Sequence, residues 1–384
     1  MIKSIITFLS YIFILFYCNL AADEYDGKLR VGLLAPFSGE YKNLGESLLL
    51  SAQLALDEID DENVIIIPRD SGTNDKDKLN LAIREIINNG AKIIIGPMSS
   101  VSFTELKKYR DTIFISLSNK EPRISGNVIN IGISLESQLK AIKQFLTSRK
   151  KNRTIILYPK NEYEEFIDKK LQSLKLKNVK IFKYSSDPRI LTGEIEKLTK
   201  YQNRKKKLEI RKKILKKQDD ERSKRELKIL DRLYTLGSVD FDSIIIIDFG
   251  NSLKSVLASL IFSDVDDESV VFTTVNQWFD ESLLSENSFK NLYFPSVDMK
   301  QFKKYNNKYY KTFLHKPDEI TILSYDALGL IYYIWNKNNG INTVDDFFIT
   351  EKIKGKIGTF RFKDKKVSQR LKIYKTENNK FKEF

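Results

Sequence analysis

The sequence predicts an α/β protein with two doubly wound lobes, each a parallel sheet covered by helices on both faces. The first observation is a set of short, continuously apolar runs rich in β-branched residues, at 29–37, 64–68 and 91–98. The second is that amphipathic segments of helical length, 44–60 and 78–89, separate these runs. Buried parallel strands joined by crossover helices produce this alternation. The third is that 384 residues exceed one ordinary core and favour two lobes.

The alternation continues through the rest of the chain. Further strands are expected at 113–117, 128–133, 154–158, 179–184, 242–248, 270–274, 292–295, 358–362 and 371–374. Further helices are expected at 136–148, 162–174, 300–313 and 324–335. The run at 154–158 opens a second series equivalent to the first, which is why two tandem doubly wound halves are predicted.

Residues 200–234 interrupt this rhythm. Residues 200–233 hold fifteen Lys and Arg against six Asp and Glu, so they carry +9 of the net +14 of the chain. Leucines at a loose helical spacing, with a break at Asp219 and Asp220, predict an antiparallel helical hairpin inserted into the second lobe. One interpretation is a solvated insertion without a partner. The other is a docking arm for an acidic protein surface, an anionic lipid head group or a cell-wall polymer.

Nucleic acid is a poor partner for this segment, because no base-stacking aromatic series is interleaved with its lysines. The residues expected to make the docking contact are the basic ones on its first half. They are Lys205, Lys206, Lys207, Arg211, Lys212 and Lys213.

The first 22 residues have the layout of a cleavable export signal. Lys3 precedes an apolar core at 5–17, and small residues end at Ala22 before a polar stretch. The alternatives are an uncleaved membrane anchor and a lipoprotein attached through Cys18, although Tyr17 precedes that cysteine where a small residue is usual. Cleavage after Ala22 would leave a mature chain without cysteine, which excludes disulfides and thiolate chemistry.

Catalytic and metal-binding signals are thin. The single histidine, His315, stands beside Pro317 in a predicted loop, and no nucleophile elbow or phosphate-binding glycine loop occurs. The acidic clusters at 57–62 and 264–268 lack the alternating oxygen ligands and central glycine of a calcium loop. We therefore expect a binding protein rather than an enzyme, with no metal and no cofactor.

Hydroxyl groups gather where predicted strands end and helices begin. Ser99 and Ser100 follow one strand, and Ser116, Ser118 and Asn119 end or follow the next. In a doubly wound sheet, ligands bind beyond these strand ends, and hydroxyls with backbone N–H groups there suit a carboxylate. The same serines also suit simple helix capping. Tyr163, at the start of a second-lobe helix, is placed to close over a ligand or to lie half-buried on the surface.

These motifs resemble a known family. Residues 31–39 (VGLLAPFSG), then Leu44-Gly45, then 90–97 (GAKIIIGP) with Ser99-Ser100 are similar to the type 1 periplasmic binding proteins of ABC importers, the leucine/isoleucine/valine-binding group. The resemblance implies two lobes joined by three crossovers and closing by hinge motion on a ligand. It also implies that the residues matching Ser99, Ser100, Ser118 and Tyr163 hold an amino acid.

Two features depart from that group. The acidic residue that holds the ligand ammonium falls near residues 275–277, where this chain has no carboxylate, and Asp248 on the preceding strand end is the candidate substitute. The alternative for Asp248 is an ordinary turn aspartate. The disulfide of the first lobe is also missing, since Met98 stands where one of its cysteines is found.

The second half resembles the penicillin-binding-protein activators, the LpoA-like branch of the same fold. The residues that carry this likeness are 233–237 (LYTLG), 278–280 (WFD), 325–327 (YDA) and 358–362 (GTFRF) with Arg370. A charged helical insertion before the Thr-Leu-Gly segment is similar to that branch too. The resemblance implies a cell-envelope factor that contacts a peptidoglycan synthase. For this sequence the resemblance implies the binding-protein fold without the additional helical-repeat region of that branch.

The sequence-based hypothesis is thus an exported, periplasmic, non-enzymatic protein that regulates peptidoglycan synthesis. The alternative is a receptor for an ABC permease that imports branched-chain or related amino acids, and a hydrolase on the same scaffold is a remote third. A first lobe is expected at 28–134 plus 298–368, and a second at 135–297 plus 369–384, with the insertion at 200–234. Membrane contact is expected to be peripheral only.

Overall fold

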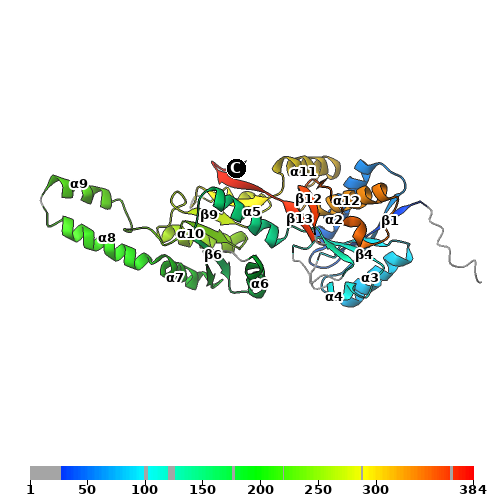
Figure 1. Ribbon diagram of the computed structural model, residues 1–384, viewed down its shortest axis with the longest axis horizontal. Coiled ribbons are helices and arrows are strands. Elements are labelled where there is room, and N and C mark those ends of the chain that lie inside the picture. Colours follow the sequence, from blue (N-terminus) through cyan, green and yellow to red (C-terminus); the bar gives the residue numbers. More distant parts are fainter. Residues whose placement is uncertain are drawn as a thin grey trace, which may run out of the picture.

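A computed structural model describes residues 27–98, 103–119, 126–174, 178–218, 220–286, 289–363 and 366–384. The chain forms two α/β lobes lying end to end, and a pair of helices projects from the far end of the second lobe (Figure 1). The predicted fold class is confirmed, including the charged helical insertion. The predicted export signal, with Lys3 and Cys18, lies outside the described residues. Within the described segments, no helix is long and apolar enough to cross a membrane.

The first lobe is built on a five-stranded parallel sheet in the order β2-β1-β3-β4-β5. Its strands are β1 (Leu29–Ala35), β2 (Val64–Asp70), β3 (Ile93–Ile95), β4 (Ile113–Ser116) and β5 (Val128–Asn130). β1, β3 and β4 are buried along almost their whole length, which explains why the sequence reads as continuous apolar runs rather than alternating ones.

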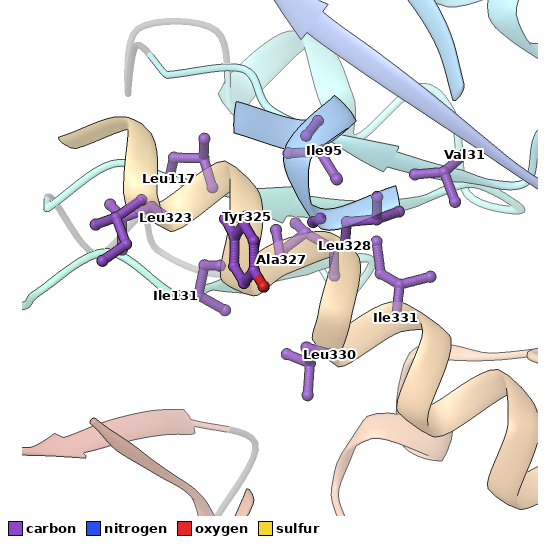
Figure 2. Packing of buried hydrophobic residues seen from close by; sticks show 14 of the residues in the cluster. Val31, Ile95, Leu117, Ile131, Leu323, Tyr325, Ala327, Leu328, Leu330 and Ile331 are labelled. Atoms are coloured by element: carbon purple, nitrogen blue, oxygen red, sulfur yellow. The ribbon is translucent and has the colours of Figure 1, made fainter. Parts of the chain in front are cut away.

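Helices cover both faces of this sheet. They are α2 (Lys42–Ile59), α3 (Lys76–Asn88), α4 (Phe103–Leu106), α11 (Met299–Phe313) and α12 (Ile322–Asn338). The apolar side chains of α12 point at strand residues such as Val31 and Ile95 (Figure 2). On the other face, α3 buries Leu79, Ile83 and Ile86. Because α12 follows most of the second lobe in the sequence, the core of the first lobe combines residues that are far apart along the chain.

The second lobe is built on a seven-stranded sheet in the order β15-β14-β10-β9-β8-β6-β7. Its parallel strands are β6 (Thr154–Pro159), β7 (Val179–Tyr184), β8 (Ser243–Ile246), β9 (Val271–Thr274) and β10 (Leu292–Ser296). Two antiparallel strands, β14 (Lys372–Glu377) and β15 (Lys380–Glu383), extend one edge, and the sequence did not reveal β15. The helices of the lobe are α5 (Leu135–Ser148), α6 (Glu164–Leu174), α7 (Pro188–Thr199) and α10 (Gly250–Phe262).

Helix α7 is, with α10, β11 and β13, among the other elements that the sequence reading missed. It follows β7 and supplies Leu191 and Ile195 to the core of the second lobe. Its start carries a recognisable signal, because Asp187 accepts a hydrogen bond from the Arg189 N–H (3.0 Å) and Pro188 occupies the first helical turn. An aspartate cap followed by proline is typical of a helix N-terminus. The basic insertion therefore begins after a complete crossover helix rather than directly after a strand.

Three passages join the lobes, as the resemblance to binding proteins implied. The chain passes from β5 into α5, from β10 into α11, and from β13 (Lys366–Arg370) into β14. Before the last passage, β11 (Ile353–Lys354), β12 (Thr359–Lys363) and β13 form a small antiparallel sheet. Short 3-10 turns at Glu281–Leu283, Glu319–Thr321 and Val344–Phe347 complete the described elements.

An aromatic cluster around Phe279 connects the two lobes. Its ring lies 5.5 Å from Phe302 of α11 in the first lobe, and 4.9 Å from Tyr374 and 5.6 Å from Phe381 in the second, measured between ring centroids. Trp278 and Phe279 adopt φ angles of 50° and 62°, a left-handed conformation that is unusual for aromatic residues. The backbone accepts this strain because packing on both sides fixes the ring of Phe279.

Glu58 joins four separate segments of the first lobe. From α2, its carboxylate pairs with Lys308 of α11 (2.8 Å) and Lys356 before β12 (3.1 Å), and it accepts a hydrogen bond from Tyr325 of α12. Burial raises the pKa of Glu58, but these three hydrogen bonds outweigh burial and lower the pKa to about 2. The fold therefore stabilises the ionised carboxylate.

Replacing Glu58 by Gln should lower stability at neutral pH, and the loss should shrink in acid. Because the pKa lies below its ordinary value of 4.5, the carboxylate stabilises the fold above that value and loses this contribution as pH falls toward 2. Urea unfolding of wild type and Glu58→Gln at neutral pH and at about pH 3 measures the change.

The matched control is Glu46→Gln on the same helix, which removes only an exposed pair with Lys42 at 3.5 Å. Such a pair contributes no more than about 1 kcal/mol. An effect of Glu58→Gln that is equally large at both pH values would contradict the role assigned to its charge.

Candidate functional site

A hollow of about 710 Å³ lies between the lobes at the carboxyl ends of the first-lobe strands. Pro36 follows β1, Ser71 follows β2, and Pro97 and Met98 follow β3. The remaining wall comes from the start of α2, the β2–α3 loop and the second lobe. These residues are Tyr41, Leu44, Gly72, Thr73, Asn74, Asp75, Lys76, Leu79, Glu162 and Tyr163. The position is the one at which doubly wound sheets bind ligands.

Asp70 holds the loops of the first-lobe wall together. Its carboxylate accepts hydrogen bonds from the N–H groups of Phe37 and Gly72, both at 2.9 Å, and pairs with Lys78 at 2.6 Å. Lys78 also donates to the Ser38 hydroxyl at 2.7 Å. Burial raises the pKa of Asp70, but Lys78, Ser38 and the two N–H groups outweigh burial and lower the pKa to about 2. The loops after β1 and β2 are thereby locked to each other.

Gly45 explains why α2 begins so close to the hollow. A Cβ at this position would lie 2.1 Å from the carbonyl oxygen of Pro36, so only glycine lets the helix approach the end of β1. This contact accounts for the Leu44-Gly45 pair in the sequence motif. It also positions Tyr41, which precedes the first residue of α2, against the hollow.

The second-lobe wall consists of Glu162 and Tyr163, in the turn between β6 and α6. Asn161 shapes this turn by accepting a hydrogen bond from the Tyr163 N–H at 2.9 Å. A hydrogen bond to Glu162 raises the pKa of Tyr163, and partial burial and the charge of Glu162 act in the same direction. A carboxylate and two phenols from opposite lobes thus face one space.

The residues expected to bind a ligand do not all gather here. Tyr163 lines the hollow, while Ser99 and Ser100 lie outside the described residues, directly after its lining residue Met98. Ser118 is buried and Asn119 is exposed beyond β4, and neither lines the hollow. The remaining candidate, Asp248, lies elsewhere.

Asp248 belongs to a buried hydrogen-bond network behind the strand end. Its carboxylate accepts hydrogen bonds from the Tyr184 hydroxyl, from Ser252 at 2.5 Å and from the Phe249 N–H at 2.8 Å. Burial of the Tyr184 phenol raises the pKa of Tyr184 well above the ordinary range for a phenol, and the adjacent charge of Asp248 acts in the same direction. These contacts are those of an aspartate that begins α10, and they occupy the carboxylate.

The segment expected to lack an acidic group holds buried amides instead. The Asn276 N–H donates to Gln138 of α5 at 2.8 Å, and its side-chain oxygen accepts from Ser296 at 2.7 Å. Gln277 donates to the carbonyl oxygens of Asp248 and Val275, at 3.2 and 3.1 Å. Both residues fix the base of the second lobe near its passages to the first.

The sequence reading missed Glu162, Tyr41 and the loop 71–76 as lining residues. Glu162 is adjacent to a residue that was selected, and the loop is a polar turn directly after a strand, so position alone was a signal for both. Among the described residues, no group of three or more His, Cys, Asp or Glu side chains could hold a metal ion. His315 is exposed, and its Nδ1 lies 3.2 Å from the Lys316 carbonyl oxygen.

The basic insertion forms a rigid arm of two helices, α8 (Tyr201–Leu215) and α9 (Glu221–Leu230), seen at the left of Figure 1. The helices share a small core of Leu208, Leu215 and Leu230, flanked by Leu227 and Leu236. Arg211 donates two hydrogen bonds of 2.8 Å to Glu226, and Lys212 pairs with Asp231 at 3.1 Å. The predicted hairpin is confirmed, and Leu236 packs against its core while Leu233 is exposed.

Arg204 attaches the arm to the second lobe. Its buried guanidinium donates to the Thr199 carbonyl at 3.0 Å, to the Thr235 hydroxyl at 2.9 Å and to the Asp264 carbonyl at 3.2 Å. It also donates to the carbonyl of Ser263, the residue after α10. The electronegative C-terminal end of a helix stabilises a cation there. Burial lowers the pKa of Arg204, and the nearby Asp264 carboxylate acts in the opposite direction.

The six basic residues expected to dock a partner divide into two groups. Arg211 and Lys212 are occupied by the ion pairs within the arm. Lys205, Lys206, Lys207 and Lys213 are exposed, and no ion pair joins them to the described residues. The four exposed lysines therefore have no ion-pair partner among the described residues, whereas Arg211 and Lys212 are paired within the arm.

Comparisons with known proteins agree with this geometry. Residues 28–174 match a family model described as periplasmic binding protein. The fold is also that of a putative branched-chain amino acid ABC transporter protein from Rhodospirillum rubrum, at a TM-score of 0.70 and 12% identity, covering 93% of this chain and 100% of that one. The chain has the type 1 periplasmic-binding-protein fold.

Two other solved structures share this binding-protein fold. LivJ from Streptococcus pneumoniae, solved with isoleucine, aligns at a TM-score of 0.56 and 16% identity over 92% of this chain and 98% of that one. The C-domain of LpoA from Haemophilus influenzae, titled a regulator of PBP1A, aligns at a TM-score of 0.61 and 12% identity. The alignment covers 92% of this chain and 99% of that one. No curated protein sequence matches the chain.

Asp70→Asn should destabilise the first-lobe wall of this binding-protein fold. An amide can accept on one side only, so a backbone N–H or Lys78 loses its acceptor, and we expect a loss of about 1–3 kcal/mol. Urea unfolding measures the loss, and limited proteolysis between residues 71 and 76 should become faster. Asp111→Asn, at an exposed aspartate of the same lobe, is the control. Unchanged stability and proteolysis in Asp70→Asn would show that the loops hold without it.

Proposed function

We propose that this chain is an exported, non-enzymatic regulator of peptidoglycan synthesis that docks onto a peptidoglycan synthase, as penicillin-binding-protein activators do. The observation that carries the proposal is the rigid, unmatched basic arm on the second lobe. The likeness in fold to the LpoA C-domain, titled a regulator of PBP1A, supports it. The resemblance of the second half of the sequence to that branch gives further support.

The arm has the properties of a docking element. Its charges face outward, and complementary charge accelerates encounter with an acidic surface and selects against basic ones. Its shape is fixed before binding by its leucine core, the Arg211–Glu226 pair and the Arg204 anchor. Little conformational freedom is then lost on binding, so more of the interaction energy appears as affinity. Docking of this kind needs no catalytic group.

A second candidate function is favoured by the hollow between the lobes. The chain would then be a periplasmic receptor that hands branched-chain or related amino acids to an ABC permease, consistent with its likeness to LivJ. Glu162 faces the hollow and offers the carboxylate that residues 275–277 lack. Tyr41 and Tyr163 would cover the ligand from the two lobes. The two functions predict different results in the following experiments.

Shortening the arm should abolish capture of a penicillin-binding protein. Residues 208–230 are replaced by a short glycine-serine linker, which removes the whole leucine core while Arg204 and Thr235 keep their contacts. Affinity capture from envelope extracts, with the penicillin-binding proteins detected by a labelled β-lactam, measures the effect. The linker variant should stay folded, as checked by circular dichroism. Equal capture by wild type and the linker variant contradicts docking through the arm.

A thermal-stability panel of amino acids tests the receptor function. A ligand that binds only the native state raises its stability by about 2.7 kcal/mol at a hundredfold excess over Kd. Under the regulator proposal the panel should be flat. A rise with leucine, isoleucine or valine that is lost in Glu162→Gln and kept in Glu268→Gln, an exposed control, favours the receptor. Such a rise together with intact synthase capture assigns both functions to the chain.

A further inference from the structure

A second hollow, of about 490 Å³, lies at the foot of the arm. It is separate from the hollow between the lobes and shares no lining residue with it. One wall is the end of α7 and the first turns of α8, and the other is the segment before β8. Its lining residues are Leu198, Thr199, Lys200, Asn203, Arg204, Lys206, Lys207, Ile210, Ser238, Val239 and Asp240.

The lining of this foot hollow is strongly positive. It has four cationic side chains and a single carboxylate, Asp240, which Lys200 neutralises at 2.6 Å. The guanidinium of Arg204 donates to carbonyl oxygens and the Thr235 hydroxyl, and the nearby Asp264 carboxylate, which accepts from Thr235, partly offsets its charge. Lys206 and Lys207 are exposed, and no ion pair or hydrogen bond joins their ammonium groups to the residues that the structure describes. Two free ammonium groups thus stand over a positive floor.

The same hollow has an apolar part. Leu198 and Val239 line it beside Ile210, whose side chain remains 48% exposed. Ile210 lies one helical turn beyond Lys206 and Lys207, so all three occupy one face of α8. Exposed isoleucine next to unpaired lysines is what a site for a mixed acidic and apolar segment requires.

We propose that the foot hollow binds a short acidic segment of a partner protein. An apolar side chain of that segment packs on Leu198, Val239 and Ile210, and its carboxylates pair with Lys206 and Lys207. The inference rests on the proposed function only for the identity of the partner, and it deepens that function by naming what the arm recognises.

The geometry favours a peptide over an anionic membrane. A flat lipid surface would meet a one-sided basic helix, whereas exposed cations here occupy several sides of the arm, including Lys205, Lys213 and Arg225. The apolar residues of the site, Leu198, Val239 and the half-exposed Ile210, come from separate segments that wall a hollow rather than from one helix face. A hollow with defined walls accepts a chain segment and fixes its register, which a lipid head group does not need.

The test uses the full chain and two fluorescent peptides, one alternating glutamate and leucine and one of glutamate alone. Binding is followed by fluorescence anisotropy for wild type, a foot variant (Lys206→Glu with Lys207→Glu) and a tip variant (Lys216→Glu with Lys217→Glu). Both variants change the charge of the arm equally, at exposed positions within or directly after α8. The foot variant should bind the glutamate-leucine peptide about tenfold more weakly or worse, and the tip variant less than about twofold.

Several results would overturn the site. Equal weakening by both variants would mean diffuse charge attraction, and binding to phosphatidylglycerol vesicles without peptide binding would mean a lipid surface. Equal affinity for the two peptides would remove the apolar contact. Circular dichroism of both variants keeps misfolding from imitating loss of binding.

Synthase capture separates this inference from the proposed function. If the tip variant loses capture and the foot variant keeps it, docking stands and the foot hollow is not its site. If wild type captures no synthase yet binds the glutamate-leucine peptide in a foot-dependent way, the hollow stands and the synthase is not its partner.

Discussion

The packing of Phe279 between the lobes is the interaction on which the arrangement of the candidate site depends. Its ring contacts α11 of the first lobe and the β14–β15 hairpin of the second, so one side chain packs against both lobes. The Tyr374 hydroxyl, which accepts a hydrogen bond from the Met299 N–H at 2.9 Å, adds a polar link beside it. The hollow between Tyr41 and Tyr163 lies between the same two lobes. Hinge motion would have to deform an apolar cluster and a strained turn together.

The arm is built on different physical grounds and does not depend on that cluster. Its leucine core is small, and Arg204 fixes it to the second lobe through a guanidinium that replaces its water shell with carbonyl oxygens and a hydroxyl. Removing a buried cation that is fully hydrogen-bonded is costly, and its hydrogen bonds hold the surrounding groups in one geometry. The chain thus concentrates most of its net charge on an element whose orientation is fixed by one buried charge.

The fold could be predicted from the sequence because local patterns of apolar residues determine it, whereas the candidate sites depend on contacts between residues far apart in the chain. Apolar runs such as 29–37 and 242–248 become buried strands whatever surrounds them, and the leucine spacing of the arm predicts its hairpin. Asp248 is a predicted ligand group from its position at a strand end, and its hydrogen bond from Tyr184, sixty-four residues away, has no local signal in the sequence. Arg211 looked free because Glu226, fifteen residues on, is outside the helical i+4 rule. Glu162 could be placed in the hollow only once the lobes were oriented.

Helix α10 connects the two regions that the sequence singled out. Its first turn follows Asp248, at the strand-end edge of the second lobe, and its last turn is followed by Ser263 and Asp264, which hold Arg204. A helix of 13 residues spans about 20 Å and is stiff on that scale. Its buried face, including Leu253, Val256, Leu257 and Leu260, is packed in the core of the lobe. Any displacement of the second lobe that opens or closes the hollow must therefore carry the arm with it as one body. The position of a partner held by the arm would then change as the hollow opens or closes. No separate chain of side-chain rearrangements is needed.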